Sequence, residues 1–355
     1  MTVVARFEIR RSGFIAPGGG ATGELPAFAR DRATLVALYR WMVLTRAFDA
    51  KAVALQRTGR LGTYASSLGQ EAVSVGLAHP MRPDDVLLPS FREHGAQLMR
   101  GVTMQELFLY WGGDERGSNF GGPRLDFPVC VPIGSQAPHA AGVALALKLR
   151  RRSQAAVAVF GDGATSKGDV YEAMNVAGVW KLPLVFVVAN NQWAISVPRQ
   201  AQTAARTLAQ KALAAGFEGL QVDGNDVVAV ADAVDQALRK ARAGAGPTLV
   251  EAVTYRLADH TTVDDASRYR DDAEVARHWK EEPVARLRAH LTDAHGWSRD
   301  EEQALIAGCA AEVERSSEDY LAQPALPPAA IFDGLYAELP AELARQRARL
   351  LEEGA

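Results

Sequence analysis

Residues 156–166 read Ala-Val-Ala-Val-Phe-Gly-Asp-Gly-Ala-Thr-Ser and carry the strongest structural signal in the chain. The first five residues are all apolar, which is typical of a short strand that is buried on both faces. Two glycines flank Asp162 and let the backbone turn tightly and approach a ligand closely. An amphipathic stretch over 167–180 follows, so the segment predicts a strand, a tight turn and the start of a helix.

The same alternation of apolar runs and amphipathic stretches extends in both directions from this turn. Such alternation is typical of βαβ units, so we predict an α/β fold with a mainly parallel sheet flanked by helices. We expect further strands at 86–88, 184–189, 219–222 and 248–255, and further helices at 32–58, 70–77, 138–149, 203–215 and 227–242. The glycine-rich segment 112–130 is predicted to be a long loop, and loops of that length are usually functional.

The ends of the chain differ from this central pattern. Residues 1–30 combine Arg6, Arg10 and Arg11 with the run Pro17-Gly18-Gly19-Gly20, and we predict a flexible N-terminal leader there. Glu8 and the early glycines do not suit the amphipathic helix of an organelle-targeting peptide. Residues 31–355 are predicted to form a single α/β domain, in which 271–355 is a charged, helical C-terminal layer.

Composition excludes several classes of partner and compartment. The 355 residues include 39 Lys and Arg against 42 Asp and Glu, so no global charge favours nucleic acid or an anionic membrane. The most apolar run, 182–189, is far too short to span a bilayer. Cys130 and Cys309 fit no metal-ligand spacing and cannot form a disulfide framework, which predicts a reducing, cytoplasmic compartment.

Polar side chains follow two predicted strands at the point where each ends. Asp162 follows the first strand, and Asn191 follows the strand predicted over 184–189. If these strands are neighbours, they lie about 5 Å apart and both side chains reach one cation. A carboxylate, an amide oxygen, a backbone carbonyl and diphosphate oxygens are the ligands that Mg²⁺ prefers.

Other interpretations of the glycines agree less well with the residues. A phosphate-binding P-loop requires Gly-Lys-Ser/Thr after its spacer, and the dinucleotide fingerprint requires a third glycine where Ser166 stands. Gly-Asp-Gly alone is also compatible with an ordinary strand-to-helix turn that a capping aspartate stabilises. The pair Asn190-Asn191 at the matching strand end favours a ligand site instead.

Gly-Asp-Gly, 26 intervening residues over 164–189 and then Asn-Asn resemble the thiamine diphosphate motif. The surrounding residues resemble the alpha subunit of the first, decarboxylating component of 2-oxoacid dehydrogenases, of the pyruvate type first and the branched-chain type next. The resemblance covers about residues 30 to 345. It rests on Leu61-Gly62-Thr63-Tyr64, Gly69-Gln70-Glu71-Ala72, Pro89-Ser90-Phe91-Arg92-Glu93-His94, Gly134-Ser135-Gln136, Asn190-Asn191-Gln192-Trp193-Ala194-Ile195-Ser196, Gln221-Val222-Asp223-Gly224, Tyr255-Arg256, His260-Thr261-Thr262, Asp264-Asp265 and Arg268-Tyr269-Arg270.

This resemblance implies a thiamine diphosphate-binding fold and a role for each matched residue. The expected magnesium ligands are Asp162, Asn191 and the carbonyl of Trp193. The expected cofactor-binding residues are Phe91, Arg92, Val131, Ile133, Asp162, Gly163, Ala164, Asn191, Ile195 and His260, of which Ile195 is the apolar wedge that bends the cofactor. His260 is the expected catalytic residue, on a loop that orders when cofactor binds. Phe91 departs from the tyrosine common in the family, which removes one hydroxyl contact worth about 1 kcal/mol.

The resemblance also implies the reaction and the partners. The implied activity is oxidative decarboxylation of a 2-oxoacid, pyruvate first, with acyl transfer to the lipoyl group of a dihydrolipoyl acyltransferase. The carboxylic acid that activates the cofactor comes from a separate beta subunit in this family, so an α2β2 assembly is expected. Branched-chain 2-oxoacids or acetoin are the alternative substrates, and a non-catalytic structural subunit is the alternative from another class.

Overall fold

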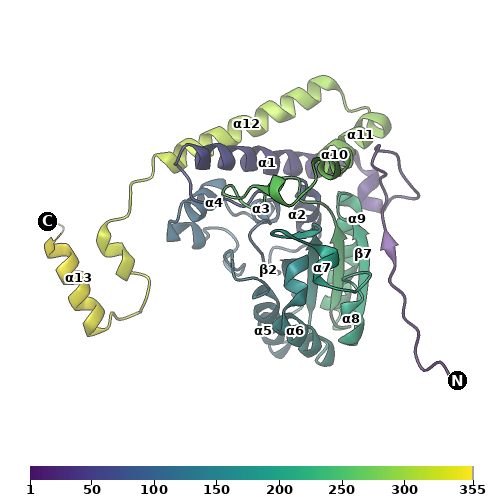
Figure 1. The fold of residues 1–355 in the computed structure, drawn as a ribbon, viewed down its shortest axis with the longest axis horizontal. Helices are drawn as coiled ribbons and strands as arrows, with labels where there is room; N and C mark the ends of the chain where they lie inside the picture. The colour runs from purple at the N-terminus through teal and green to yellow at the C-terminus, as the bar shows by residue number, and fades with distance from the viewer. Residues whose placement is uncertain (354–355) are drawn as a thin grey trace. The chain divides into compact units, whose positions relative to one another are not determined.

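The computed structural model describes residues 1–353, and its core is one six-stranded sheet in which every neighbouring pair of strands is parallel (Figure 1). The strand order is β1-β7-β8-β4-β3-β2. The strands of this sheet are β1 (Arg11–Ser12), β2 (Val86–Leu88), β3 (Ala156–Gly161), β4 (Leu184–Asn190), β7 (Glu218–Asp223) and β8 (Thr248–Val253). A separate antiparallel pair consists of β5 (Trp193–Ala194) and β6 (Val197–Pro198). The predicted parallel α/β sheet is therefore confirmed.

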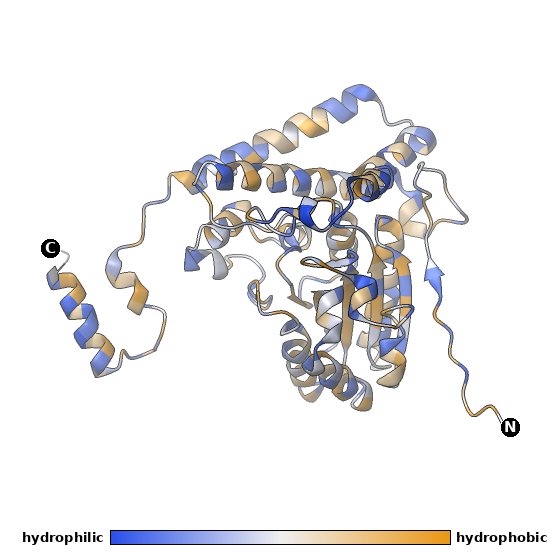
Figure 2. Ribbon diagram, viewed as in Figure 1, coloured by the Kyte–Doolittle hydropathy of each residue, from blue (hydrophilic) through white to orange (hydrophobic). Residues whose placement is uncertain are grey.

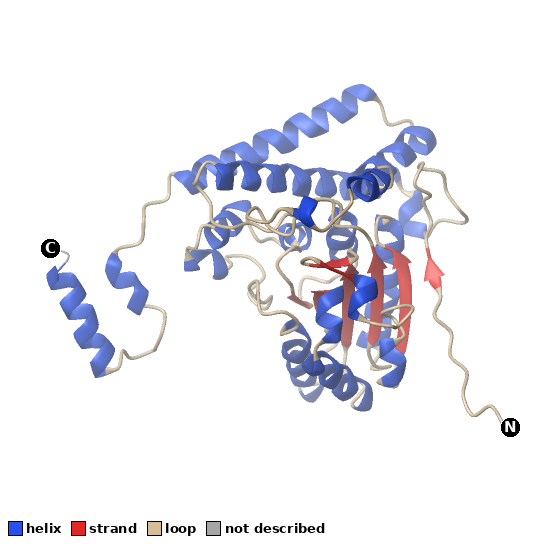
Figure 3. Cartoon of the chain, viewed as in Figure 1, coloured by secondary structure: helices blue, strands red, loops and turns tan. Residues whose placement is uncertain are grey.

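Helices cover both faces of the sheet, and further helices follow its last strand along the chain (Figure 3). The α-helices are α1 (Arg32–Arg57), α2 (Glu71–Ala78), α3 (His94–Met99), α4 (Met104–Trp111), α5 (Gln136–Leu149), α6 (Gly168–Val179), α7 (Arg199–Gln202), α8 (Lys211–Ala214), α9 (Val227–Arg242), α10 (Asp272–Trp279), α11 (Pro283–His295), α12 (Arg299–Leu321) and α13 (Ala341–Glu353). The 3-10 turns are η1 (Ala27–Arg30), η2 (Glu115–Ser118), η3 (Asp162–Ser166), η4 (Ala266–Arg268) and η5 (Pro328–Phe332).

Alternate side chains of the central strands enter two separate hydrophobic layers. In β3, Ala158 and Phe160 pack with α5 and α6, whereas Val157 and Val159 pack with α2 and α9. This division follows from the two-residue repeat of a strand, and it explains why both kinds of position are apolar. Figure 2 shows the hydrophobic residues gathered in these strands. Helix α1 packs on the outside of α2 and α3 and against α11.

The register of the sheet brings three strand ends to one edge. Gly161 of β3 pairs with Ala189 of β4, and Asn190 of β4 pairs with Val253 of β8. The residues that follow these strands, Asp162 and Asn191 among them, therefore leave the sheet side by side. Ligands of open α/β sheets bind at this carboxyl edge.

Most predicted elements are confirmed to within a few residues, but the helix predicted over 203–215 is wrong. Only α8 is helical within that segment, and α7 ends just before it, at Gln202. The hydroxyls of Thr203 and Thr207 accept hydrogen bonds from nearby backbone N–H groups, and Ala209 N donates to the Glu251 carboxylate at 3.0 Å. Local side-chain acceptors compete with helical hydrogen bonds, so the apolar spacing did not produce a helix here.

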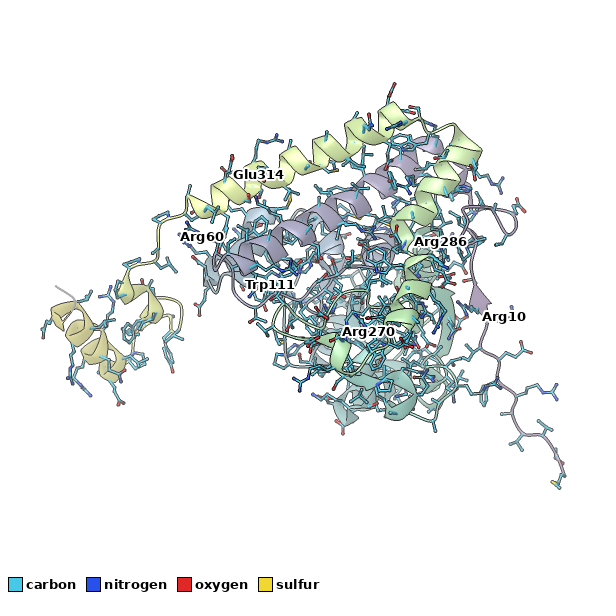
Figure 4. All side chains as sticks on the ribbon, turned by 45° about the horizontal axis from the view of Figure 1, so that its top comes forward. Arg10, Arg60, Trp111, Arg270, Arg286 and Glu314 are labelled. Carbon is cyan, nitrogen blue, oxygen red and sulfur yellow. The ribbon has the colours of Figure 1, made fainter. Side chains whose placement is uncertain are left out.

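The N-terminal segment is held to the sheet from Arg11 onward, which corrects the prediction of a flexible leader over 1–30. Strand β1 pairs with β7, and Asp226 accepts hydrogen bonds from the backbone N–H groups of Phe14 and Ile15 at 2.7 and 2.9 Å. Arg286, labelled in Figure 4, donates to the Ile15 carbonyl at 3.2 Å. Residues 1–10 have no regular secondary structure.

By its internal contacts the chain divides into two compact units, and the single domain over 31–355 stays a prediction. The first unit is Met1–Ser317, and the second begins at Glu318, within α12. The described part of the second unit contains η5 and α13, and the predicted helical character of this region is confirmed. Across residues 1–353, every helix is too short or too polar to cross a membrane.

Candidate metal and diphosphate site

Asp162 begins the turn η3 at the end of β3, and its side chain is almost fully buried. Its Oδ2 accepts a hydrogen bond from Gln202 Nε2 at 3.0 Å. Burial raises the pKa of Asp162, against the opposing effects of the Gln202 hydrogen bond and the Arg256 charge. A buried carboxylate whose hydrogen-bonding side chain is a neutral amide is suited to a bound cation, which would compensate its charge.

Asn191 follows β4 and offers an oriented amide oxygen beside Asp162. Its Nδ2 donates to Gln70 Oε1 at 3.0 Å, and its Oδ1 accepts from the backbone N–H of Trp193 at 3.2 Å. The described residues contain no cluster of three His, Cys, Asp or Glu side chains that could hold a metal. Asp162, Asn191 and the Trp193 carbonyl instead provide one carboxylate and two neutral oxygens, a set that suits Mg²⁺ completed by phosphate and water.

The turn η3 also presents its backbone for close approach by a ligand. A Cβ at Gly163 would lie 2.6 Å from Ala194 Cβ, so only glycine fits between η3 and the β5–β6 hairpin. Lys211 Nζ donates to the Thr165 carbonyl at 2.7 Å and to its hydroxyl at 2.9 Å, which holds the end of the turn. The backbone of Gly163 and Ala164 therefore forms a narrow, fixed cradle of the kind that binds phosphate groups.

Ile195 connects β5 to β6 and has a strained backbone. Its φ is +55°, which is an outlier for a β-branched residue and costs about 1–3 kcal/mol. Arg256 Nη2 donates to the Ile195 carbonyl at 2.9 Å and stabilises this conformation. The side chain is 56% exposed, so the hairpin presents a large apolar group at the open edge of the site.

A second group of predicted residues, Phe91, Arg92 and His260, meets beside the expected metal ligands. Arg92 is buried, and its Nη2 lies 2.7 Å from the His260 carbonyl and 3.1 Å from His260 Nδ1. The Phe91 ring lies edge-to-face with the His260 ring at 6.1 Å, and the Arg92 guanidinium lies 5.1 Å from the Phe91 ring. Burial lowers the pKa of Arg92 to about 10, and the nearby charge of Arg256 contributes.

The contacts of His260 fix its protonation state. Nδ1 faces the guanidinium of Arg92 and that of Arg256, at 3.1 and 3.4 Å. Guanidinium groups only donate, so Nδ1 accepts and the proton of the neutral ring is on Nε2. Burial, followed by the charges of Arg92 and Arg256, lowers the pKa of His260 to about 4. At neutral pH His260 is therefore a neutral hydrogen-bond donor through Nε2.

Arg256 joins the two groups of residues, although no separate role was predicted for it. Its side chain is fully buried, and Nη1 lies 3.4 Å from the Trp193 carbonyl while Nη2 donates to the Tyr269 hydroxyl at 2.8 Å. That hydroxyl donates to Asp264, whose carboxylate also accepts from His260 N at 2.9 Å. The position of Arg256 directly after the strand predicted over 248–255 was the signal that could have identified it. Arg270, labelled in Figure 4, donates to the Ala258 carbonyl at 3.1 Å and closes the base of the same loop.

Val131 and Ile133 lie in the loop before α5, with side chains that are 52% and 47% exposed. Gly134, with φ of +82°, continues this loop against η3 and α6, where a Cβ would lie 3.7 Å from Ala164 Cβ and 2.9 Å from Val170 Cγ2. The loop therefore runs beside the cradle. Its contact with a cofactor ring stays a prediction.

A buried network of hydrogen bonds connects Arg92 to Asp49. Asp49 accepts hydrogen bonds from the Tyr64 hydroxyl at 2.9 Å and from Ser67 N at 2.7 Å, and it also accepts from Ser66 Oγ. The Ser66 carbonyl in turn accepts from Arg92 Nη1. Asp49 thus holds the turn that contains Ser66, whose carbonyl is a hydrogen-bond acceptor for Arg92. The sequence did not reveal this connection.

His94 extends this network and predicts a pH dependence of stability. Trp111 Nε1 donates to His94 Nε2 at 3.0 Å, so Nδ1 carries the proton toward the Tyr64 hydroxyl, 3.2 Å away. Burial, and then the charge of Arg92, lowers the pKa of His94 to about 3. The folded pKa is below the unfolded value near 6.5, so between these values the unfolded chain binds more protons and stability falls as pH falls.

We therefore expect this one histidine to cost about 1.4 kcal/mol of unfolding free energy per unit as pH falls below 6.5. Gln at position 94 retains an acceptor for Trp111 and does not titrate. Denaturant unfolding of wild type and His94→Gln from pH 7 to pH 5 should show the variant gaining about 2 kcal/mol relative to wild type. Equal pH slopes would show that His94 titrates normally.

Comparison with known proteins identifies the family of the chain. The family of dehydrogenase E1 components matches residues 39–329. The chain is 42% identical to 3-methyl-2-oxobutanoate dehydrogenase subunit alpha of Mycobacterium tuberculosis over 341 residues, 96% of this chain and 93% of that protein. It is 41% identical to pyruvate dehydrogenase E1 component subunit alpha of Acholeplasma laidlawii over 317 residues, 88% of this chain and 91% of that protein. The corresponding Staphylococcus aureus subunit is 39% identical over 313 residues, 88% of this chain and 85% of that protein. The chain belongs to the family of dehydrogenase E1 components, as an alpha subunit of a 2-oxoacid dehydrogenase.

Proposed function

We propose that this alpha subunit binds thiamine diphosphate with Mg²⁺ and acts with a separate beta subunit in the oxidative decarboxylation of a 2-oxoacid. The acyl group would pass to the lipoyl group of a dihydrolipoyl acyltransferase. One observation supports the proposal most. Asp162, Asn191 and the Trp193 carbonyl share the carboxyl edge of the sheet, and Arg256 links them to Arg92 and His260.

The chain's own residues would bind and orient the cofactor. Asp162, Asn191 and the Trp193 carbonyl would hold the metal, and the backbone of Gly163 and Ala164 would hold the diphosphate. Burial lowers the pKa of both Arg92 and Arg256, and the charge of Arg256 lowers the pKa of Arg92 further, so an anionic diphosphate would stabilise these buried cations. When bound, thiamine diphosphate supplies the carbanion-stabilising chemistry.

The remaining roles concern the reacting end of the site. Ile195 would support the bent cofactor, and the Nε2–H group of His260 would donate a hydrogen bond to an oxygen of the cofactor or substrate. The Phe91 ring lies edge-to-face with the His260 ring and has no hydroxyl. The lack of the tyrosine hydroxyl at Phe91 would therefore cost one hydrogen bond and leave the proposed metal ligands unchanged.

A beta subunit would complete this site. Ile195, Val131 and Ile133 are all about half exposed and all belong to segments that border the cradle. Exposed apolar side chains around a polar centre are typical of a protein interface. We propose that the beta subunit covers them in an α2β2 assembly and supplies the activating carboxylic acid. Cys130 and Cys309 are both free, which is compatible with the cytoplasmic location that we propose.

Pyruvate is the substrate that we propose first, because the residues around Cys130 to Gln136 resemble the pyruvate type. A branched-chain 2-oxoacid is the second candidate, favoured by the mycobacterial relative that is named for 3-methyl-2-oxobutanoate and matches 96% of this chain. The difference in identity between the two kinds of relative is too small to choose between them.

The experiment is a turnover assay of the purified chain with and without its beta subunit. We expect no 2-oxoacid-dependent dye reduction by the chain alone, because this chain does not supply the activating acid. The assembled pair should use pyruvate with a higher kcat/KM than 3-methyl-2-oxobutanoate. The reverse preference would establish the branched-chain alternative, and preference for acetoin would establish the third substrate. No turnover of any of them would support the non-catalytic structural subunit.

A further inference from the structure

We propose that Gln70 is a positioning residue of the metal site, which orients the Asn191 amide through Oε1 and holds a second donor, Nε2, for an oxygen that arrives with the metal. This inference rests on the proposed function, because it concerns the same Mg²⁺ and diphosphate site. Gln70 is almost fully buried, and its Oε1 accepts from Asn191 Nδ2 at 3.0 Å.

The orientation of both amides follows from one backbone donor. The N–H group of Trp193 lies 3.2 Å from the Asn191 side chain and can only donate, so the Asn191 atom that faces it is oxygen. Asn191 Nδ2 must then face Gln70, and the Gln70 atom that receives it must be oxygen. The Nε2 group of Gln70 is therefore the atom left over, and it is buried without a hydrogen-bond partner.

The backbone that carries Gln70 is fixed on both sides. Gly69 has φ of +88°, and a Cβ there would lie 2.7 Å from the Tyr255 carbonyl oxygen. Thr254 Oγ1 donates to the Gly69 carbonyl at 2.9 Å, which ties this turn to the end of β8. Glu71 accepts from Gly69 N at 3.0 Å and from Arg46 Nε at 2.8 Å. Gln70 is thus held rigidly enough to impose an orientation on Asn191.

Burying an amide N–H group without a hydrogen-bond acceptor costs about 1–3 kcal/mol. The Nε2 group of Gln70 therefore favours a bound state in which an acceptor is present. Bound Mg²⁺ is coordinated by oxygen atoms, which belong to its water molecules or to the diphosphate. Both sources share one chemistry, an oxygen acceptor next to the Asn191 ligand. Residues that orient metal ligands in this way typically change metal affinity about 10- to 100-fold when they are replaced.

The test measures Mg²⁺ binding by the assembled alpha–beta complex in the presence of thiamine diphosphate. Gln70→Met keeps the volume of the side chain and removes both amide contacts. We expect it to weaken the Kd for Mg²⁺ by about 10-fold or more in calorimetric titration. Its thermal unfolding without Mg²⁺ should stay close to that of wild type, because the lost hydrogen bond is offset by removal of a buried unpartnered donor.

A conservative variant and a matched control make the result specific. Gln70→Glu retains an oxygen that accepts from Asn191 and should recover most of the Mg²⁺ affinity that Gln70→Met loses. Gln97→Met changes another buried glutamine, whose two amide atoms are both unpartnered and which lies on α3, and it should bind Mg²⁺ as wild type does.

Two outcomes would overturn the proposal. Wild-type Mg²⁺ affinity in Gln70→Met would show that Asn191 needs no orienting partner. Equal weakening in Gln70→Met and Gln97→Met would show a general effect of losing a buried amide. Both outcomes leave the proposed function intact, because they require that the wild-type complex binds Mg²⁺. Failure of wild type to bind Mg²⁺ with thiamine diphosphate would instead remove the proposed function and this inference together.

Discussion

Asp162→Asn should strongly weaken magnesium-dependent binding of thiamine diphosphate while leaving the fold intact. Asp162 is the one charged group among the three expected ligands, and it is 2% exposed. Asparagine has nearly the same shape and removes the attraction between the carboxylate and Mg²⁺. We expect the affinity for Mg²⁺ to fall at least about 100-fold, which corresponds to ~2.7 kcal/mol. Burial raises the pKa of Asp162, so neutralising it should not lower stability without the metal.

Calorimetric titration of the assembled complex with thiamine diphosphate and Mg²⁺ measures this effect. Asp235→Asn is the matched control, because it removes the same charge from the outer surface of α9, where Asp235 pairs with Arg239. Asn191→Ala should also weaken Mg²⁺ binding, but less than Asp162→Asn, because it removes a neutral ligand. Wild-type affinity in Asp162→Asn would exclude this carboxylate as a metal ligand.

His260→Ala should lower kcat by about 100-fold while changing the Kd for thiamine diphosphate much less. Arg92 and Arg256 face Nδ1 of His260, so the proton of the ring is on Nε2. We expect the proposed metal ligands to bind Mg²⁺ without this Nε2–H donor. Its loss should therefore affect the reacting end of the site more than cofactor binding. Reductive acylation of a lipoyl domain should decrease more than 2-oxoacid decarboxylation measured with an artificial acceptor.

His295→Ala provides the control for a histidine change, since His295 ends α11 and its ring lies against His290. It should have wild-type kcat in both assays. Equal losses of cofactor affinity and kcat in His260→Ala would mean that His260 only supports Arg92. Unchanged kcat would make His260 an ordinary loop histidine.

The parts of the fold that were predicted correctly are those that short segments specify. The apolar run of β3, the two glycines around Asp162 and the period of α9 each give one structure from local residues alone. Each failure involves at least one contact with a residue far away in the sequence. Arg11 and Ser12 become a strand only because β7 presents a free edge to them. The segment 203–215 has helical spacing, but its threonines and the distant Glu251 provide competing hydrogen bonds.

Residue types and spacing were enough to indicate the chemistry of the site, because Asp162 and Asn191 each follow directly on a strand and neighbouring parallel strands end together. The partners that orient these two side chains could be identified only in the folded chain. Gln70 and Asn191 are 121 positions apart, and Arg92 and His260 are 168 positions apart. Arg256 follows a strand like many other residues, and only its burial between the β5–β6 hairpin and the loop that carries His260 distinguishes it. No local pattern encodes such contacts, because their energies depend on packing and dielectric surroundings that exist only after the sheet and its helices have assembled.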